Sequence, residues 1–184
     1  MAIKTFTTGE VLTSSDTNTY LANSGLVYVK SQTIGTSVGS VTVSSAFSTD
    51  YDNYKIIIDG GVCSAAGSFT LRIGTSTTGY YYAAIFSQYT TTTPLALSST
   101  VGTAFQEAGR CDTTGINMNV EVFSPFLALK TGFRGNSTDY NTAGFLISTA
   151  GFLNNTTSHT SLTVIPAAGT LTGGTITVYG YRKG

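Results

Sequence analysis

From residue 25 onward, apolar and polar residues alternate with a period of two, which is typical of strands that bury one face. In "INMNVEVF" (116–123), every second residue from Ile116 to Val122 is apolar. The segment "SFTLRIG" (68–74) has the same alternation, with its arginine on the polar side. The pattern therefore predicts a body built from strands.

About ten short strands are expected, separated by clusters of Gly, Asn, Ser and Thr. The expected strands are 26–34, 40–47, 54–60, 68–74, 80–86, 116–123, 127–133, 143–150, 160–166 and 174–182. Between residues 87 and 115 we expect one irregular strand, near 103–108, and two exposed loops. Because no long amphipathic helices alternate with the strands, the chain is predicted to form an antiparallel sandwich or barrel.

One segment, residues 9–25, has the pattern of a helix. Thr13 can cap this helix by accepting a hydrogen bond from the Asp16 amide, and the Asp16 side chain can accept one from the Thr13 amide, as in a capping box. We expect about two turns over 14–22, ended by Gly25 in the left-handed conformation. A helix this short is unstable alone in water. It must therefore pack against its own domain, a sister chain or another protein.

The composition is poor in charge and rich in hydroxyl groups. Charged residues make up 10% of the chain, against about 25% in typical domains, and there are 34 Thr and 20 Ser. Such a surface fits an extracellular or particle-bound protein better than a free cytosolic enzyme. Nine basic residues balance nine acidic ones, so no electrostatic footprint for nucleic acid or anionic lipid is expected.

Two cysteines, Cys63 and Cys111, are far apart in the sequence. They could pair, but two cysteines make neither a disulfide framework nor a zinc-ligand spacing. We interpret them as two small buried thiols. The N-terminal residues lack the apolar core of a signal peptide, and no apolar run approaches the ~20 residues that span a bilayer. We therefore expect synthesis in a cytoplasm and no membrane partner.

Residues that could perform catalysis are few and scattered. The single histidine, His159, lies in the polar stretch "NNTTSHTSL" and is expected in an exposed loop. Asp50 and Asp52 are expected in a simple turn, and Glu107 is one of several scattered carboxylates. No nucleophile elbow, metal-ligand spacing or phosphate-binding fingerprint is present. Glycoside hydrolysis by paired carboxylates is the remaining enzymatic alternative. We expect no enzymatic activity, no cofactor and no metal.

A tyrosine cluster offers a candidate contact surface. Alternation places Tyr80 and Tyr82 on one face of a strand and Tyr81 on the other, with Tyr89 close by in the sequence. One face can belong to the core. In the functional alternative these four side chains form an exposed surface, because tyrosine combines a large rigid contact area with a polar tip. A partner protein and a carbohydrate fit this surface equally well.

The opening "KTFTTGEVLTSSDTNTYLANSG" resembles the start of many virion proteins of tailed bacteriophages. The segments "YDNYKIIIDG", "LRIGTSTTGYYYA" and "GGTITVYGYRK" resemble the β-sandwich modules of phage fibre and head-decoration proteins. The likeness spans almost the whole chain. It implies a structural, non-enzymatic role and a homotrimer. The absence of coiled-coil heptads and of a repeated shaft disfavours a long fibre.

Pattern and resemblance together predict an all-β protein, an antiparallel jelly-roll-like β-sandwich over residues 26–184. They predict an N-terminal attachment arm with one small helix over residues 1–25. The expected function is external capsid decoration, in which a homotrimer of this cement protein binds the major capsid protein and stabilises the shell. The alternative is a short tail fibre or tail-associated receptor-binding protein. The residues expected to attach the arm to the particle are Leu12, Asp16, Asn18, Tyr20 and Leu21.

Overall fold

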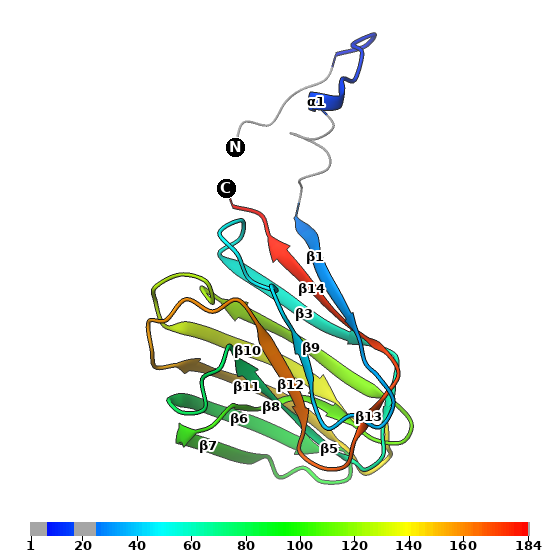
Figure 1. The fold of residues 1–184 in the computed structure, drawn as a ribbon. Helices are drawn as coiled ribbons and strands as arrows, with labels where there is room; N and C mark the ends of the chain where they lie inside the picture. The colour runs from blue at the N-terminus through cyan, green and yellow to red at the C-terminus, as the bar shows by residue number, and fades with distance from the viewer. Residues whose placement is uncertain (1–6, 17–24, 184) are drawn as a thin grey trace.

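The computed structural model describes residues 7–16 and 25–183, which are almost entirely β-structure (Figure 1). The helix α1 spans Ser14–Asp16. The strands are β1 (Leu26–Thr33), β2 (Val41–Val43), β3 (Asn53–Asp59), β4 (Val62–Cys63), β5 (Gly67–Ile73), β6 (Tyr80–Gln88), β7 (Leu95–Gly102), β8 (Phe105–Cys111), β9 (Ile116–Phe123), β10 (Thr131–Thr138), β11 (Phe145–Leu153), β12 (Leu162–Pro166), β13 (Leu171–Thr172) and β14 (Thr175–Tyr181). As the alternation predicted, the body of the chain consists of strands joined by turns.

Eight of the described strands form the two sheets of a jelly roll. One sheet has the order β1-β14-β3-β9 and the other β2-β12-β5-β8, with antiparallel neighbours throughout. Along the chain, most successive strands of this set cross from one sheet to the other, as Greek-key connections do in jelly rolls. The prediction of an antiparallel jelly-roll-like β-sandwich is therefore confirmed.

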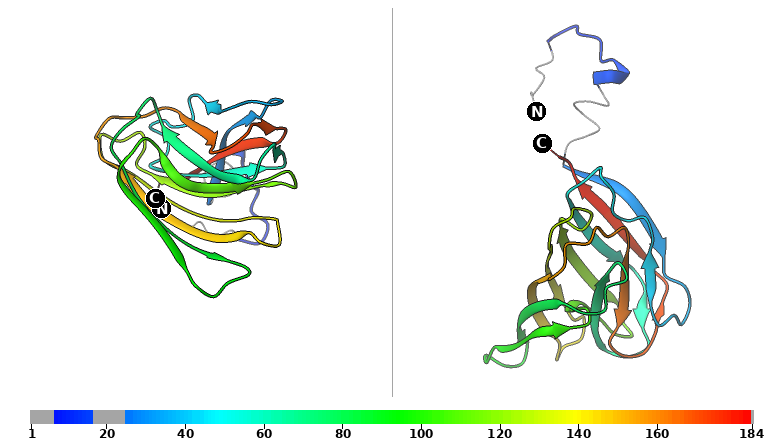
Figure 2. Two further views of the ribbon diagram at one scale, coloured as in Figure 1. Left: turned by 90° about the horizontal axis from the view of Figure 1, so that it is seen from below. Right: turned by 60° about the vertical axis from the view of Figure 1, so that its left-hand side comes forward.

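Two hairpins inserted into the jelly roll widen one of its sheets. β10 pairs with β9 and with β11, while β6 pairs with β11 and with β7. The larger sheet therefore has eight strands, in the order β1-β14-β3-β9-β10-β11-β6-β7. Its two edges, β1 and β7, lie at opposite ends of the molecule in Figures 1 and 2.

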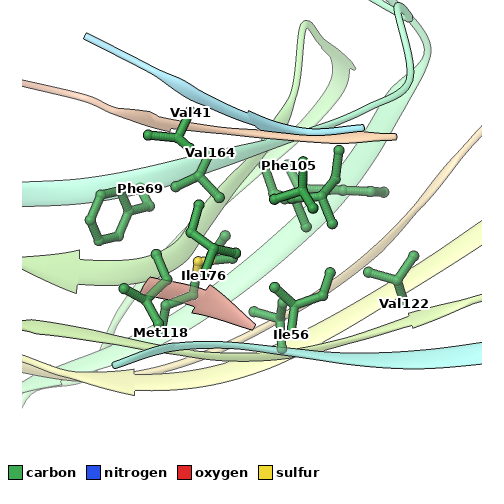
Figure 3. Close-up of a cluster of buried hydrophobic side chains, with 14 of the residues drawn as sticks. Val41, Ile56, Phe69, Phe105, Met118, Val122, Val164 and Ile176 are labelled. Atoms are coloured by element: carbon green, nitrogen blue, oxygen red, sulfur yellow. The ribbon is translucent and has the colours of Figure 1, made fainter. Parts of the chain in front are cut away.

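Apolar side chains fill the space between the two sheets. The pattern in β9 is as predicted, because every second residue from Ile116 to Val122 is buried. Figure 3 shows side chains of both sheets meeting in this core, with the labelled residues Val41, Phe69, Phe105 and Val164 from the smaller sheet and Ile56, Met118, Val122 and Ile176 from the larger one.

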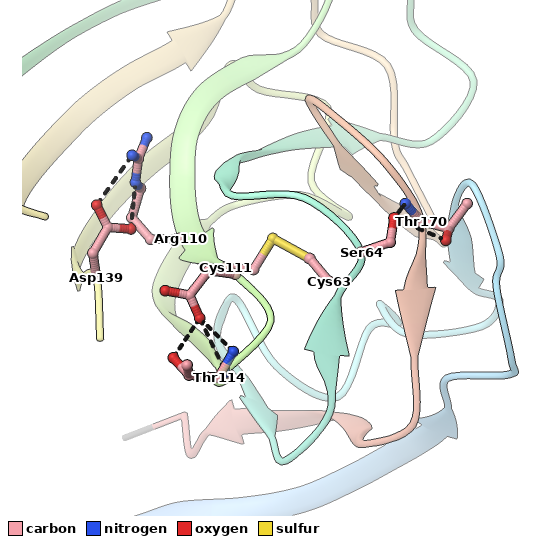
Figure 4. Close-up of a disulfide and its surroundings, with 9 residues drawn as sticks. Cys63, Ser64, Arg110, Cys111, Thr114, Asp139 and Thr170 are labelled. Carbon is pink, nitrogen blue, oxygen red and sulfur yellow. Dashed lines mark hydrogen bonds and ion pairs between the residues drawn. A yellow bond between two sulfur atoms is a disulfide. The ribbon is translucent and has the colours of Figure 1, made fainter. Parts of the chain in front are cut away.

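Cys63 and Cys111 form a disulfide, so their interpretation as two free thiols is wrong (Figure 4). Their Cα atoms lie 5.7 Å apart. The Cys63 amide donates a hydrogen bond to the Asp112 carbonyl at 2.8 Å, which holds the two segments side by side. Spacing along the sequence could not show this approach, because it depends on how β4 folds back next to the end of β8.

Several strand expectations differ from the structure. The strand expected over 40–47 is only Val41–Val43, and the short strands β4 and β13 were not expected. The interval 87–115 contains two strands, β7 and β8, instead of one irregular strand. β7 was missed because it is an edge strand whose Thr- and Ser-rich sequence alternates weakly, with only half-burial at Leu97. The strand expected over 127–133 begins at Thr131, because turns occupy the residues before it, including Ser124 at φ 57°.

Candidate functional site

A continuous row of side chains crosses the face of the eight-stranded sheet that points away from the core. Each residue of the row is the Cα partner of the next one, and alternation places their side chains on the same face. In strand order from β1 to β7, the row is Tyr28, Tyr179, Lys55, Glu121, Arg134, Ala150, Ala83 and Ser98. We call this face, opposite the core, the outer face.

Two hollows, each of about 310 Å³, lie next to each other on the outer face. The first is lined mainly by polar residues, among them Lys55, Asn119, Glu121, Arg134, Asn136 and Ser148. The second is lined mainly by Tyr81, Ala83, Ser98, Thr100 and Phe152. Ala150 belongs to both. Because the row changes from long side chains to alanines where β10 meets β11, the surface there is hollow instead of filled.

The polar hollow holds one carboxylate between two cations. Glu121 accepts hydrogen bonds from Arg134 Nε and from the Tyr181 hydroxyl. Arg134 first, and then Tyr181, lower the pKa of the Glu121 carboxyl below its ordinary value. Burial, followed by the contact with Glu121, raises the pKa of Tyr181 to about 12. Lys55 lies opposite Glu121 across the β3–β9 pair. The three charged groups of the hollow therefore carry a net charge of plus one.

The second hollow has an aromatic wall. The rings of Tyr81 and Phe152 stack with centroids 5.0 Å apart and planes 8° from parallel. Phe152 is 38% exposed. Lys130 Nζ lies 5.2 Å from the centroid of the Phe152 ring. A cation over a ring and a second ring stacked on it hold the Phe152 side chain in place, although it lies at the surface.

The structure corrects half of the predicted tyrosine surface. Tyr80 and Tyr82 lie on one face of β6 and Tyr81 on the other, as the alternation predicts, but Tyr80 and Tyr82 are buried in the core. The Tyr80 hydroxyl accepts a hydrogen bond from the Ile73 amide at 2.9 Å, and burial raises the pKa of Tyr80 to about 12. They cannot form an exposed contact surface, because the inner side of β6 packs against β8.

The other two tyrosines, Tyr81 and Tyr89, are accessible to solvent but have different roles. Tyr81 lines the second hollow. Tyr89 is 50% exposed, and its hydroxyl bonds to Thr138 and to the Asp139 carbonyl, where β10 ends. Of the predicted surface, Tyr81 therefore belongs to the candidate site, while Tyr89 anchors the neighbouring hairpin.

The N-terminal segment starts a helix in the predicted way. Thr13 and Asp16 bond reciprocally, with the Thr13 amide donating to Asp16 Oδ2 at 3.2 Å and the Asp16 amide donating to Thr13 Oγ1 at 3.1 Å. This is a capping box. Beside it, Leu12 is 49% exposed. The other residues expected to attach the arm lie outside the described residues; these are Asn18, Tyr20 and Leu21.

His159 is buried, so its expected place in an exposed loop is wrong. Its ring packs against Gly74, where an added Cβ would meet His159 Nδ1. His159 Nε2 lies 3.2 Å from Asn155 Oδ1. Burial lowers the pKa of His159. The polar neighbours of His159 in the sequence gave no sign of this packing, because it depends on Gly74, the turn residue after β5, leaving room for the ring.

The acidic residues weighed for catalysis have structural partners. Asp50 accepts a hydrogen bond from the Ser48 hydroxyl at 2.9 Å within the expected turn. Asp52 Oδ1 lies 2.9 Å from Lys183 Nζ. Glu107 pairs with Arg110, which also binds Asp139 through two parallel hydrogen bonds of 2.9 and 3.1 Å. These carboxylates therefore hold turns and hairpins in place.

Over residues 7–16 and 25–183, no three His, Cys, Asp or Glu side chains gather in a way that could hold a metal ion. In the same part of the chain, no helix has both the length and the apolar character needed to cross a membrane.

Most residues of the polar hollow were missed by sequence reasoning. Asn119 and Glu121 could be assigned to a polar strand face, because 116–123 alternates clearly. Arg134 and Asn136 lie in β10, whose position was predicted too early in the chain, and Ser148 is one of many serines. Their gathering depends on the register of strands that are far apart in the sequence. Comparison of the chain with known protein families, with curated proteins and with solved structures finds no match.

Proposed function

We propose that this chain is a non-enzymatic structural protein of a tailed-phage particle, an external decoration (cement) protein that binds the shell as a homotrimer. In this proposal residues 1–25 attach to the particle and residues 26–184 are displayed on its surface. The observation that carries it is the described part of the N-terminal segment, which lies apart from the sandwich in Figures 1 and 2. There Val11 and Leu12 are 80% and 49% exposed next to a capped helix start.

A short capped helix with exposed apolar neighbours is suited to docking. Isolated helices of this length gain little stability from their own hydrogen bonds, so the helix becomes stable when a partner buries the apolar side chains that precede it, Val11 and Leu12. An amphipathic helix that fits a groove of another protein is a common mode of recognition. The shell protein would supply that groove.

The two ends of the described sandwich lie side by side, which is compatible with attachment through one end of the molecule. The Arg182 amide donates a hydrogen bond to the Gly25 carbonyl, so the start of β1 and the end of β14 lie together. The β6–β7 hairpin lies at the far end of the molecule (Figure 1). A protein held through residues before Gly25 would therefore present the β6–β7 hairpin away from its attachment point.

Symmetry explains how a small sandwich can strengthen a shell. Three copies around a local threefold axis need only one type of interface, repeated until the ring closes. Each copy can then bridge neighbouring shell subunits. The Cys63–Cys111 disulfide adds support, since disulfides persist mainly outside the reducing cytosol, where a released particle resides.

Deletion tests the attachment role. Particles assembled with a chain lacking residues 2–24 are expected to carry none of it, while the deleted chain keeps the circular-dichroism spectrum and melting transition of a β-sandwich. In the full-length chain, Leu12→Asp should reduce occupancy at least tenfold. Thr8→Asp is the matched control, because Thr8 is an exposed turn residue of the same segment. Decoration by the deleted chain at full-length levels would contradict the proposal.

The hollowed outer face favours one second candidate, a short tail fibre or tail-associated receptor-binding protein. A receptor-binding protein needs an exposed surface that can hold a ligand, and the outer-face hollows offer such a surface. Quantitative mass spectrometry of purified particles separates the two roles. Shell decoration repeated over the capsid symmetry requires on the order of hundreds of copies, whereas a tail part is present in a few dozen at most.

A further inference from the structure

We propose that the two adjoining hollows of the outer face form one groove that binds an acidic oligosaccharide, a chain of sugar rings carrying carboxylate groups. This inference goes beyond particle attachment and does not rest on it. Each hollow has about 310 Å³, and ligand sites begin at roughly 300 Å³. Ala150 lines both, so the hollows meet at this residue.

The length of the groove fits several sugar rings. Its polar end begins at Lys55 on β3, and its aromatic end lies at Tyr81 on β6. Four strand spacings separate β3 from β6 in the sheet order, which corresponds to about 19 Å at roughly 4.8 Å per spacing. A single sugar would fill only one end, so the groove selects an extended chain.

The aromatic end matches the apolar face of a sugar ring. One side of a pyranose carries C–H groups that are slightly positive, and these pack on the negative face of an aromatic ring. The stacked rings of Tyr81 and Phe152 form such a wall, and Ala83 and Ala150 leave the floor next to it open. Phe152 is held on β11 and Tyr81 on β6, so the wall is formed before a ligand arrives.

The polar end offers unpaired hydrogen-bonding groups. The side chains of Asn119, Asn136 and Ser148 are exposed and have no hydrogen-bond partner within the described part of the chain. An amide both donates and accepts, and a hydroxyl does the same. Sugar hydroxyls require that combination, because each of them also donates and accepts.

The charges select a carboxylate-bearing sugar. Arg134 is 64% exposed, its Nε donates to Glu121 and its guanidinium lies over the Phe123 ring, while its two Nη groups have no hydrogen-bond partner in the described residues. A guanidinium edge binds a carboxylate through two parallel hydrogen bonds. Lys55 adds a second cation, and it forms no ion pair in the described residues. Two cations against the one carboxylate of Glu121 leave a positive site for the ligand, and they form no extended basic stripe of the kind that nucleic acid requires.

Affinity electrophoresis tests the proposal with four acidic polysaccharides in the gel: polygalacturonate, alginate, hyaluronate and polysialic acid. Neutral dextran serves as the comparison. We expect at least one acidic polymer to retard the full-length protein at 50 mM salt, with dextran at least tenfold weaker. Retardation by none of the four, or equal retardation by dextran, would overturn the proposal, as would binding of single-stranded DNA alone.

Variants locate the site without disturbing the core. Ala150→Trp fills the point shared by both hollows and should weaken binding at least tenfold, and Asn136→Ala should weaken it several-fold. Thr33→Trp is the matched control, because Thr33 is exposed on β1 and lines neither hollow. All three variants should keep the melting temperature of the wild type. Equal binding by Ala150→Trp and wild type would place the ligand elsewhere and refute the assignment. The polysaccharide test and the particle-attachment test are independent. Whether or not the chain lacking residues 2–24 binds particles, the binding of polysaccharide by the full-length protein and its variants is expected to be the same.

Discussion

The Cys63–Cys111 disulfide should contribute a large part of the stability of the sandwich. It joins residues 48 positions apart, at β4 and at the end of β8. Replacing both cysteines with alanine, or reducing the bond, releases this loop in the unfolded chain. The loop-entropy relation for 48 residues gives about 14 cal/mol/K, or about 4 kcal/mol at 25 °C. For a chain of this size the melting temperature should then fall by about 8–16 °C.

Urea unfolding followed by circular dichroism measures this effect. The oxidised protein is compared with and without a reductant, and the Cys63→Ala/Cys111→Ala variant is the control. The reductant should lower the free energy of unfolding of the wild type and leave the variant unchanged. Two results would refute the reasoning: an unchanged free energy of unfolding on reduction of the wild type, or two reactive thiols per chain in the native protein.

Three further predictions concern side chains that packing controls. Tyr80→Phe leaves the buried Ile73 amide without its acceptor and should lower the free energy of unfolding in urea by about 1–3 kcal/mol. An unchanged free energy of unfolding would show that this hydrogen bond does not stabilise the fold. Gly151→Ala places a Cβ against the Tyr81 carbonyl oxygen, closer than van der Waals contact allows, and should destabilise the sandwich by about 1–3 kcal/mol. Gly39→Ala is the control, because the added Cβ meets nothing within 4 Å, and it should change stability by less than about 0.5 kcal/mol. Equal melting temperatures of Gly151→Ala and Gly39→Ala would contradict the register between β6 and β11. Burial lowers the folded-state pKa of His159, so from about pH 6.5 downward the unfolded chain binds a proton that the folded chain does not, and stability falls until the pH reaches the folded pKa. In His159→Gln this slope should be absent, and an identical pH profile of the two proteins would show that His159 is not buried.

The fold was predictable from sequence where one face of a strand is buried and the other is exposed to solvent. The alternation in β9 and in β5 follows directly from the sandwich, because each inward side chain meets the opposite sheet. β7 was not predictable in this way. It is an edge strand in which only Leu97 among the large apolar residues is half-buried, so its apolar and polar residues do not alternate clearly. The jelly-roll order itself comes from pairings between distant segments, such as β1 with β14, which no local pattern encodes.

The candidate site was much less predictable, because cross-strand register creates it. Lys55, Glu121, Arg134 and Ala150 are far apart in the sequence, yet they are consecutive in one row of the sheet. Likewise, the tyrosine run showed which side chains share a face of β6 but not which face meets the core. The sequence already named Tyr81 as a candidate contact, but its stacking partner Phe152 on β11 could not be foreseen.

The central claim is that the chain attaches through its N-terminal segment and leaves the outer face free. Labelling of single introduced thiols with a maleimide dye tests it directly, since the native cysteines are bonded to each other and do not react. Leu12→Cys and Ser148→Cys are both exposed positions, one in each part. On particle-bound protein, the account predicts that the Leu12→Cys thiol becomes protected while the Ser148→Cys thiol reacts as fast as in the free protein. Protection at position 148 with full reactivity at position 12 would contradict it.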